Sequence, residues 1–248
     1  MTTAVRVLRV VGVGAVVVLA LVAVLAALRT ELPLSPGVMS DALGPEDGER
    51  VADYVERAAD SLVEGEDQGD DDEDGAPAAE ARRWALVTAD RAVSTTEADG
   101  MVQPLPRVSG LYVQVPVEGV AMPVTGVTLA EPVAGEADRT AVFDRGLDRV
   151  VDRLGREPSD QDPSDRDRGA AVNALTVSRI RDGEPAIIGL LARGAPEQLR
   201  EVADRPGVRA VEALPADAVW QRFAVRPLQP QQREVALPLP DDAPVPAG

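Results

Sequence analysis

Residues 186–192 read Ala-Ile-Ile-Gly-Leu-Leu-Ala, and residues 208–214 read Val-Arg-Ala-Val-Glu-Ala-Leu. The first is a continuous apolar run of the length of a β-strand, and the second, of similar length, is expected to be the returning strand. Between them, Pro196 fits the first turn of a helix, where its missing N–H costs no hydrogen bond. The buried face of that helix is expected to consist of Leu199, Val202 and Ala203, and Pro206-Gly207 ends it. The pattern predicts a strand–helix–strand unit.

An earlier stretch repeats this order. Residues 84–88 read as a strand, and Ser94-Thr95-Thr96-Glu97 matches a capping box at the start of a short helix. Residues 111–117 alternate between apolar and other side chains, the period of a half-buried strand, and residues 124–129 are expected to return as its hairpin partner. Two such units predict an α+β fold, a ferredoxin-like α/β sandwich with helices on one face of a mostly antiparallel sheet.

A longer helix is expected between the two units. Its apolar stripe consists of Phe143, Leu147, Val150, Val151 and Leu154, and Gly155 stands where a C-terminal cap belongs. Residues 156–169 are rich in Asp and Pro and predict a polar insertion, whereas residues 170–180 fit a helix better than a strand. The predicted α+β domain therefore covers residues 82–226, with an edge strand at 219–225.

Residues 10–28 are an unbroken run of apolar and small side chains between Arg9 and Arg29. As a helix, this run spans ~28 Å, about one hydrocarbon core. The run predicts a transmembrane helix over 10–29, in contact with the lipid bilayer, after a cytoplasmic stub at 1–9. The alternative is a cleavable signal peptide, whose apolar region usually has only ~7–15 residues.

The arginines near this helix set its expected orientation. Arg6, Arg9 and the terminal amine precede the run, and only Arg29 follows it closely. Because basic residues favour the cytoplasmic side, we expect a single-pass protein of the cell membrane with its C-terminal domain extracytoplasmic.

Negative charge is concentrated just after the predicted helix. Of the formal net charge of −17, residues 41–74 carry −13, from fifteen acids and two arginines. Residues 30–81 are expected to hold a juxtamembrane helix at 46–63 and a disordered acidic linker, and residues 227–248 a disordered, proline-rich tail. The acidic balance excludes nucleic acid as an expected partner.

The amino-acid composition excludes most of the common kinds of catalytic site. The chain has no His, Cys or Lys, so it lacks the commonest general base, and Ser-His and Ser-Lys pairs are impossible. Asp144, Asp148 and Asp152 alternate with Arg145, Arg149 and Arg153, a pattern typical of a solvated helix face. We therefore expect no enzyme, no catalytic residue, no cofactor and no identifiable small-molecule ligand. A carboxylate-based enzyme stays as the less favoured alternative.

A partial calcium-loop pattern occurs in the acidic linker. Asp70, Asp72, Asp74 and Gly75 match its first positions, but Ala81 replaces the acid that closes the loop. We therefore predict no metal site there. Weak divalent-cation binding by the acidic run is left open.

Two blocks carry a resemblance to known proteins. Residues 82–88, together with 194–200 and 205–212, resemble uncharacterised single-pass membrane-anchored proteins of actinobacteria. The second block also resembles the closing strand–helix–strand unit of subtilisin-type protease propeptides, which implies an inhibitor or chaperone module as an alternative function. The function expected from the whole sequence is a non-enzymatic protein-interaction module of the cell envelope, with another envelope protein as its partner.

Overall fold

The computed structural model describes residues 41–63, 82–129, 139–156 and 163–246, which belong to one compact unit, Asp41–Gly248. The predicted cytoplasmic stub, transmembrane helix and acidic linker lie outside these residues and gain no support from the structure. None of the helices that the structure describes is long and apolar enough to cross a membrane.

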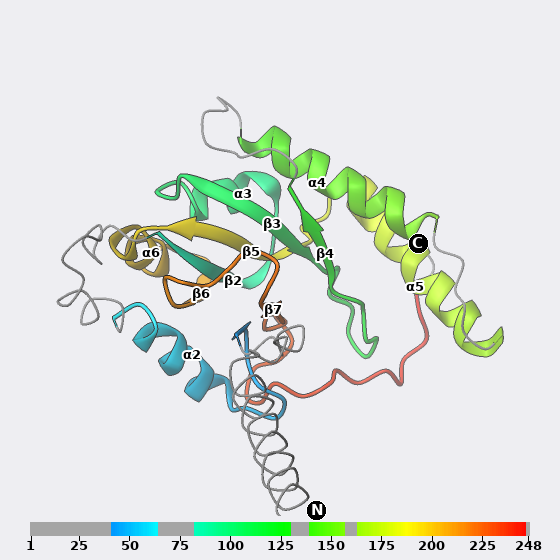
Figure 1. The fold of residues 1–248 in the computed structure, drawn as a ribbon. Helices are drawn as coiled ribbons and strands as arrows, with labels where there is room; N and C mark the ends of the chain where they lie inside the picture. The colour runs from blue at the N-terminus through cyan, green and yellow to red at the C-terminus, as the bar shows by residue number, and fades with distance from the viewer. Residues whose placement is uncertain (1–40, 64–81, 130–138, 157–162, 247–248) are drawn as a thin grey trace, which may run out of the picture. The chain divides into compact units, whose positions relative to one another are not determined.

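The unit is built on an antiparallel sheet of five strands in the order β4-β3-β5-β2-β6 (Figure 1). The strands are β2 (Arg83–Val93), β3 (Arg107–Val113), β4 (Thr125–Thr128), β5 (Ile187–Gly194) and β6 (Val208–Ala213). The predicted α+β class is confirmed. β3 begins earlier than the strand expected at 111–117, and the predicted hairpin with β4 forms.

Two interleaved strand–helix–strand units account for most of the sheet. The first is β2, α3 (Thr95–Met101) and β3, and the second is β5, α6 (Pro196–Ala203) and β6. The capping box of α3 is confirmed, because the Glu97 N–H donates to Ser94 Oγ at 3.3 Å and the Ser94 N–H donates to the Glu97 carboxylate at 2.8 Å. Pro196 stands at the start of α6 as predicted.

The main hydrophobic core lies between one face of the sheet and the helices α3, α4 (Arg139–Leu154), α5 (Pro163–Arg181) and α6. Figure 1 shows α4 and α5 running side by side, and their residues are in contact. Strand alternation explains which side chains enter this core, since Ala85 and Val87 of β2 belong to it while Trp84 and Leu86 belong to a cluster on the opposite face.

The opposite face, called here the outer face, is covered by smaller elements. Helix α2 (Val51–Asp60) packs on β6, and β1 (Ala42–Leu43) pairs in parallel with β7 (Ala224–Val225) in a two-stranded sheet. The edge strand predicted at 219–225 is therefore limited to its last two residues, and it does not join the main sheet.

Two segments have more regular or more closely packed structure than the sequence suggests. Residues 163–169, which belong to the predicted polar insertion, are helical and form the start of α5. The C-terminal segment 227–246 is packed rather than disordered. Its Leu228 and Ala236 are fully buried, and the Val51 N–H donates to the Glu234 carbonyl at 2.8 Å. Proline prevents a regular ladder but permits this extended packing.

Candidate functional site

An aromatic cluster lies on the outer face of the sheet. Trp84 of β2 contacts Trp220 and Phe223, which belong to the connection between β6 and β7. The ring centroids of Trp84 and Trp220 are 4.5 Å apart, and those of Trp84 and Phe223 are 6.1 Å apart. Trp84 is 5% exposed, whereas Trp220 is half-buried. The two tryptophans of the chain are therefore in direct contact, and one of them reaches the solvent.

Two arginines flank this cluster. The strand register places Trp84 opposite Arg193, and Arg193 opposite Arg107. The guanidinium carbons of Arg107 and Arg193 lie 5.4 and 5.5 Å from the ring centroid of Trp84. Each such cation–π contact is worth ~0.5–1 kcal/mol at an exposed site. The contacts hold both cations near one aromatic ring.

Neither cation is neutralised within the described part of the chain. Arg107 donates to Ser109 Oγ at 2.9 Å and Arg193 to the carbonyl of Arg82 at 3.2 Å, and no described carboxylate pairs with either guanidinium. Like charges directly opposite each other destabilise a sheet. This row of residues, Trp84, Arg193 and Arg107, is called the arginine row below.

An open groove of about 270 Å³ adjoins the arginine row. The residues that line it include the aromatic Tyr112, Trp220 and Phe223, together with Leu191 of β5. Gln221 has φ of 65°, an uncommon backbone conformation for a residue other than glycine. Gln221 itself lines the groove, and it follows directly after Trp220 in the loop.

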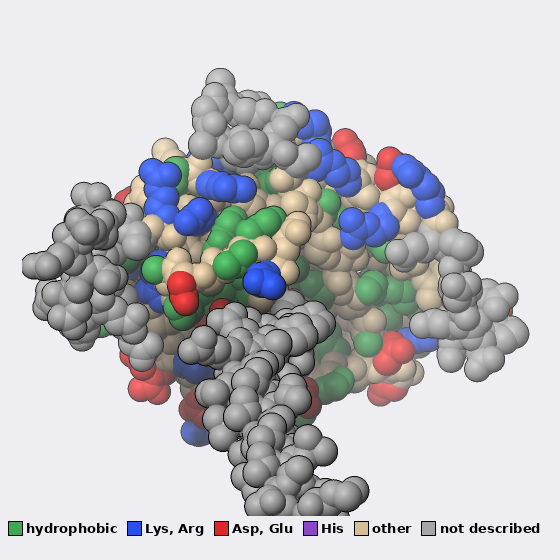
Figure 2. Space-filling model, viewed as in Figure 1, with side chains coloured by type: hydrophobic (Ala, Val, Ile, Leu, Met, Phe, Trp, Pro, Cys, Tyr) green, Lys and Arg blue, Asp and Glu red, His purple; other side chains and the backbone are tan. Residues whose placement is uncertain are grey.

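The groove offers a polar group as well as apolar walls. This group is the hydroxyl of Tyr112, whose pKa burial raises to about 12. Figure 2 shows hydrophobic side chains gathered near the middle of this view with Lys and Arg side chains close to them. The arrangement can bind an apolar side chain beside an anionic group.

A buried carboxylate occupies the other end of the outer face. Glu212 of β6 accepts from the Gly44 N–H at 2.5 Å and forms an ion pair with Arg57 of α2, which also pairs with Glu49 at 2.9 Å. Burial raises the pKa of the Glu212 carboxyl, against the opposing effects of Gly44 and Arg57. These charged and polar groups pair with one another, and the pairs join α2 and the end of β1 to β6 of the sheet.

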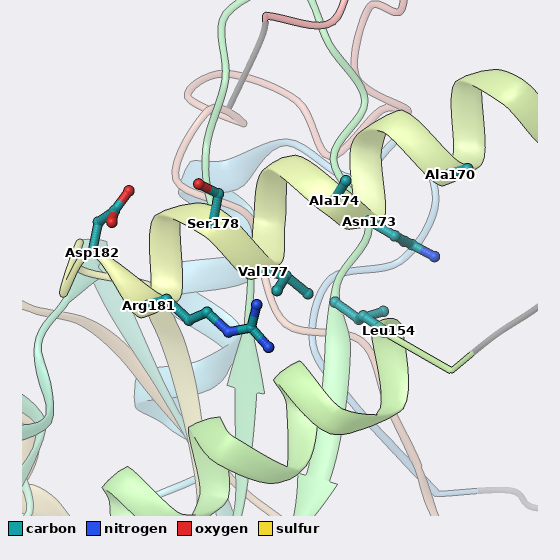
Figure 3. Close-up of a pocket in the computed structure, with 9 residues that line it drawn as sticks. Leu154, Ala170, Asn173, Ala174, Val177, Ser178, Arg181 and Asp182 are labelled. Atoms are coloured by element: carbon teal, nitrogen blue, oxygen red, sulfur yellow. The ribbon is translucent and has the colours of Figure 1, made fainter.

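Larger surface hollows occur in the described part of the chain, and one of about 450 Å³ lies beside Glu212 and Arg57. Two others lie among the helices. One, of about 550 Å³, lies between α4 and α5, and Figure 3 shows Arg181 extending from α5 near Val177 and Leu154. The other, of about 670 Å³, lies between α3 and α6, where Arg91 pairs with Glu97 at 2.8 Å. Neither hollow combines an aromatic wall with a pair of unneutralised charges.

The acids singled out in the sequence do not form a site. Asp144, Asp148 and Asp152 are exposed on α4, as expected for a solvated face. Arg149 and Arg153 are not simple partners of these acids, because they donate to the Thr128 and Gly126 carbonyls of β4, at 3.3 and 2.9 Å.

The calcium-loop pattern at 70–81 lies outside the described residues. Across the residues that are described, no three acidic side chains are placed to hold a metal ion.

No family model, curated protein or solved structure matches this chain, so neither resemblance seen in the sequence gains support from the comparisons.

Proposed function

We propose that this chain is a membrane-anchored, non-enzymatic protein-interaction module whose binding surface is the outer face of the sheet, at the arginine row and the adjoining groove. The observation that carries the proposal is the pair Arg107 and Arg193, which lack a described carboxylate partner beside an aromatic groove. Trp, Tyr and Arg are the residues that contribute most binding energy in protein–protein interfaces. The same three residue types meet here.

The proposal includes a ferredoxin-like architecture. The order β3-β5-β2-β6, formed by two interleaved strand–helix–strand units, supports this assignment, and β4 adds one strand at the edge. In such a sandwich, one sheet face is packed by helices and the other is available. Helix α2 and the C-terminal segment cover part of that second face, which leaves the end with the arginine row for a partner.

The proposal also places the module outside the cell membrane. Residues 10–28 would cross the bilayer once with the N-terminus in the cytoplasm, as the apolar run and the arginines before it indicate. Protease added to spheroplasts that express the full chain should then digest the unit that begins at Asp41. Complete protection in intact spheroplasts, with digestion after lysis, would contradict this orientation.

Site-specific photo-crosslinking tests the binding surface. Val219 is 55% exposed and precedes Trp220, so a photoreactive amino acid at this position reports on whatever occupies the groove. Leu237 is 52% exposed on the C-terminal segment and is the matched control. We expect a protein adduct of discrete mass from position 219 that disappears with Trp220→Ala. Equal adducts at both positions, or none at 219, would contradict the proposed surface.

A further inference from the structure

We infer that the partner contributes an acidic, extended peptide segment, whose carboxylates pair with Arg107 and Arg193 and whose apolar side chain enters the groove of Tyr112, Trp220 and Phe223. This inference rests on the proposed function and names the chemistry of its partner.

The charge of the arginine row favours an acidic partner. Many arginines in the described part of the chain already have a carboxylate within 4 Å, among them Arg57, Arg91, Arg156, Arg168, Arg179, Arg205 and Arg226. Arg107 and Arg193 have no such carboxylate in the described part of the chain; they lie opposite each other in the sheet, and both face the ring of Trp84. A guanidinium presents a rigid fork of donors that matches a carboxylate. A bound carboxylate would also relieve the repulsion between these two opposite residues.

The spacing of the arginine row and the groove along β5 fits an extended peptide. Leu191 lines the groove and lies two residues before Arg193 on the same face of β5. An extended chain rises ~3.3 Å per residue and places alternate side chains on one side. An acidic residue over the arginine row and an apolar residue two positions away would therefore meet their respective sites together.

The size of the groove favours a peptide over an anionic membrane surface. A groove of about 270 Å³ between aromatic walls suits one or two apolar side chains. The observations therefore favour an acidic peptide.

Trp84 and Trp220 are the two tryptophans of the chain, so intrinsic tryptophan fluorescence reports directly on this surface. The full chain in neutral detergent micelles is titrated with a synthetic peptide Gly-Ser-Glu-Asp-Glu-Gly-Leu-Ser-Gly. We expect a saturable change in emission whose apparent Kd rises with salt. The double variant Arg107→Gln with Arg193→Gln should bind about tenfold more weakly or worse, equivalent to ~1.4 kcal/mol.

Matched variants keep the result interpretable. Arg156→Gln with Arg233→Gln removes the same charge from exposed positions elsewhere and should leave the affinity nearly unchanged. Arg107→Lys with Arg193→Lys retains the charge but loses the planar fork, so it should bind with intermediate affinity even if the Gln variant folds poorly. A peptide with Ser in place of Leu should bind more weakly than the original.

Several results would overturn the inference. They are no saturable change, equal affinity of the double Gln variant, or equal affinity of the peptide that lacks Leu. A change in tryptophan emission with phosphatidylglycerol vesicles but not with the peptide would assign the surface to lipid binding. If the tryptophan emission changed when the acids at 70–74 were replaced by their amides but not when the peptide was added, the arginines would be assigned to the chain's own acidic segment. A crosslink at Val219 that survives the double Gln substitution would retain the proposed function and discard this inference alone.

Discussion

Trp84 and Trp220 stack with their ring centroids 4.5 Å apart, which fixes the loop before β7 on the outer face of β2. Replacing Trp220 with Ala should therefore cost about 2 kcal/mol of unfolding free energy, because a half-buried ring and its aromatic contacts are lost. Denaturant unfolding followed by far-UV circular dichroism measures this change. Val219→Ala, at an exposed neighbouring position, should stay within about 0.5 kcal/mol of the original chain.

The edge strand β4 is protected by Arg149 and Arg153 of α4, which donate hydrogen bonds to its backbone carbonyls. Replacing both with Ala should leave these backbone acceptors open to pairing with another chain, and exposed edges of this kind promote association. Light scattering after size-exclusion chromatography should then show a larger, concentration-dependent mass. Arg156→Ala, which removes a pair with Asp152 but no contact with β4, should behave like the original chain.

Gly146 allows α4 to approach the sheet closely. A Cβ at this position would lie 2.9 Å from Leu111 Cδ1 and 3.1 Å from Leu129 Cδ2. Gly146→Ala should destabilise the fold by about 1 kcal/mol, since overpacking exceeds the gain in helix propensity. Gly100→Ala is the matched control, because a Cβ there meets nothing within 4 Å, and it should be neutral or slightly stabilising in thermal unfolding.

The capping box of α3 predicts a pH dependence of stability. Arg91 and the Ser94 backbone and side chain lower the pKa of the Glu97 carboxyl to about 2. The stabilisation from this carboxylate is then complete above its ordinary pKa of 4.5 and is lost as the pH falls toward 2. Because Glu97 is exposed to screening by solvent, the loss is on the order of 0.5 kcal/mol.

Chemical denaturation at a series of pH values measures the effect of Glu97. The stability difference between the original chain and Glu97→Gln should shrink as the pH falls below 4.5. Asp148→Asn, on the exposed face of α4, controls for the loss of one acid. A difference that stays constant down to the lowest pH would show that the carboxylate does not stabilise the helix start.

Much of the sheet follows from local sequence signals. The apolar run at 186–192, Pro196 and the turn at Pro206-Gly207 fix β5, α6 and β6, because each signal acts over a few residues. The helical start of α5 could not be predicted, because residues 156–169 are rich in Asp and Pro. The apolar residues of α5 also do not follow a single helical stripe. The C-terminal segment was misread because its prolines suggest disorder, while the burial of Leu228 depends on residues far away in the sequence.

The candidate site was missed for a similar reason. Trp84, Arg107, Arg193 and Trp220 are far apart in the chain and come together only when the strand order and register are known. One signal was present, since both tryptophans of an aromatic-poor chain fall in or beside predicted strands. The net charge of the whole chain is negative, so it gives no indication that Arg107 and Arg193 lie together on one face of the sheet.

Hydrogen–deuterium exchange of the full chain with and without the acidic peptide tests the central claim most directly, because it locates the binding surface on the fold. The account predicts slower exchange in β3, at the end of β5 and in the loop from Pro215 to Phe223, with no change in α4 and α5. Protection confined to α4 and α5, or no protection at a peptide concentration that saturates the fluorescence change, would contradict it.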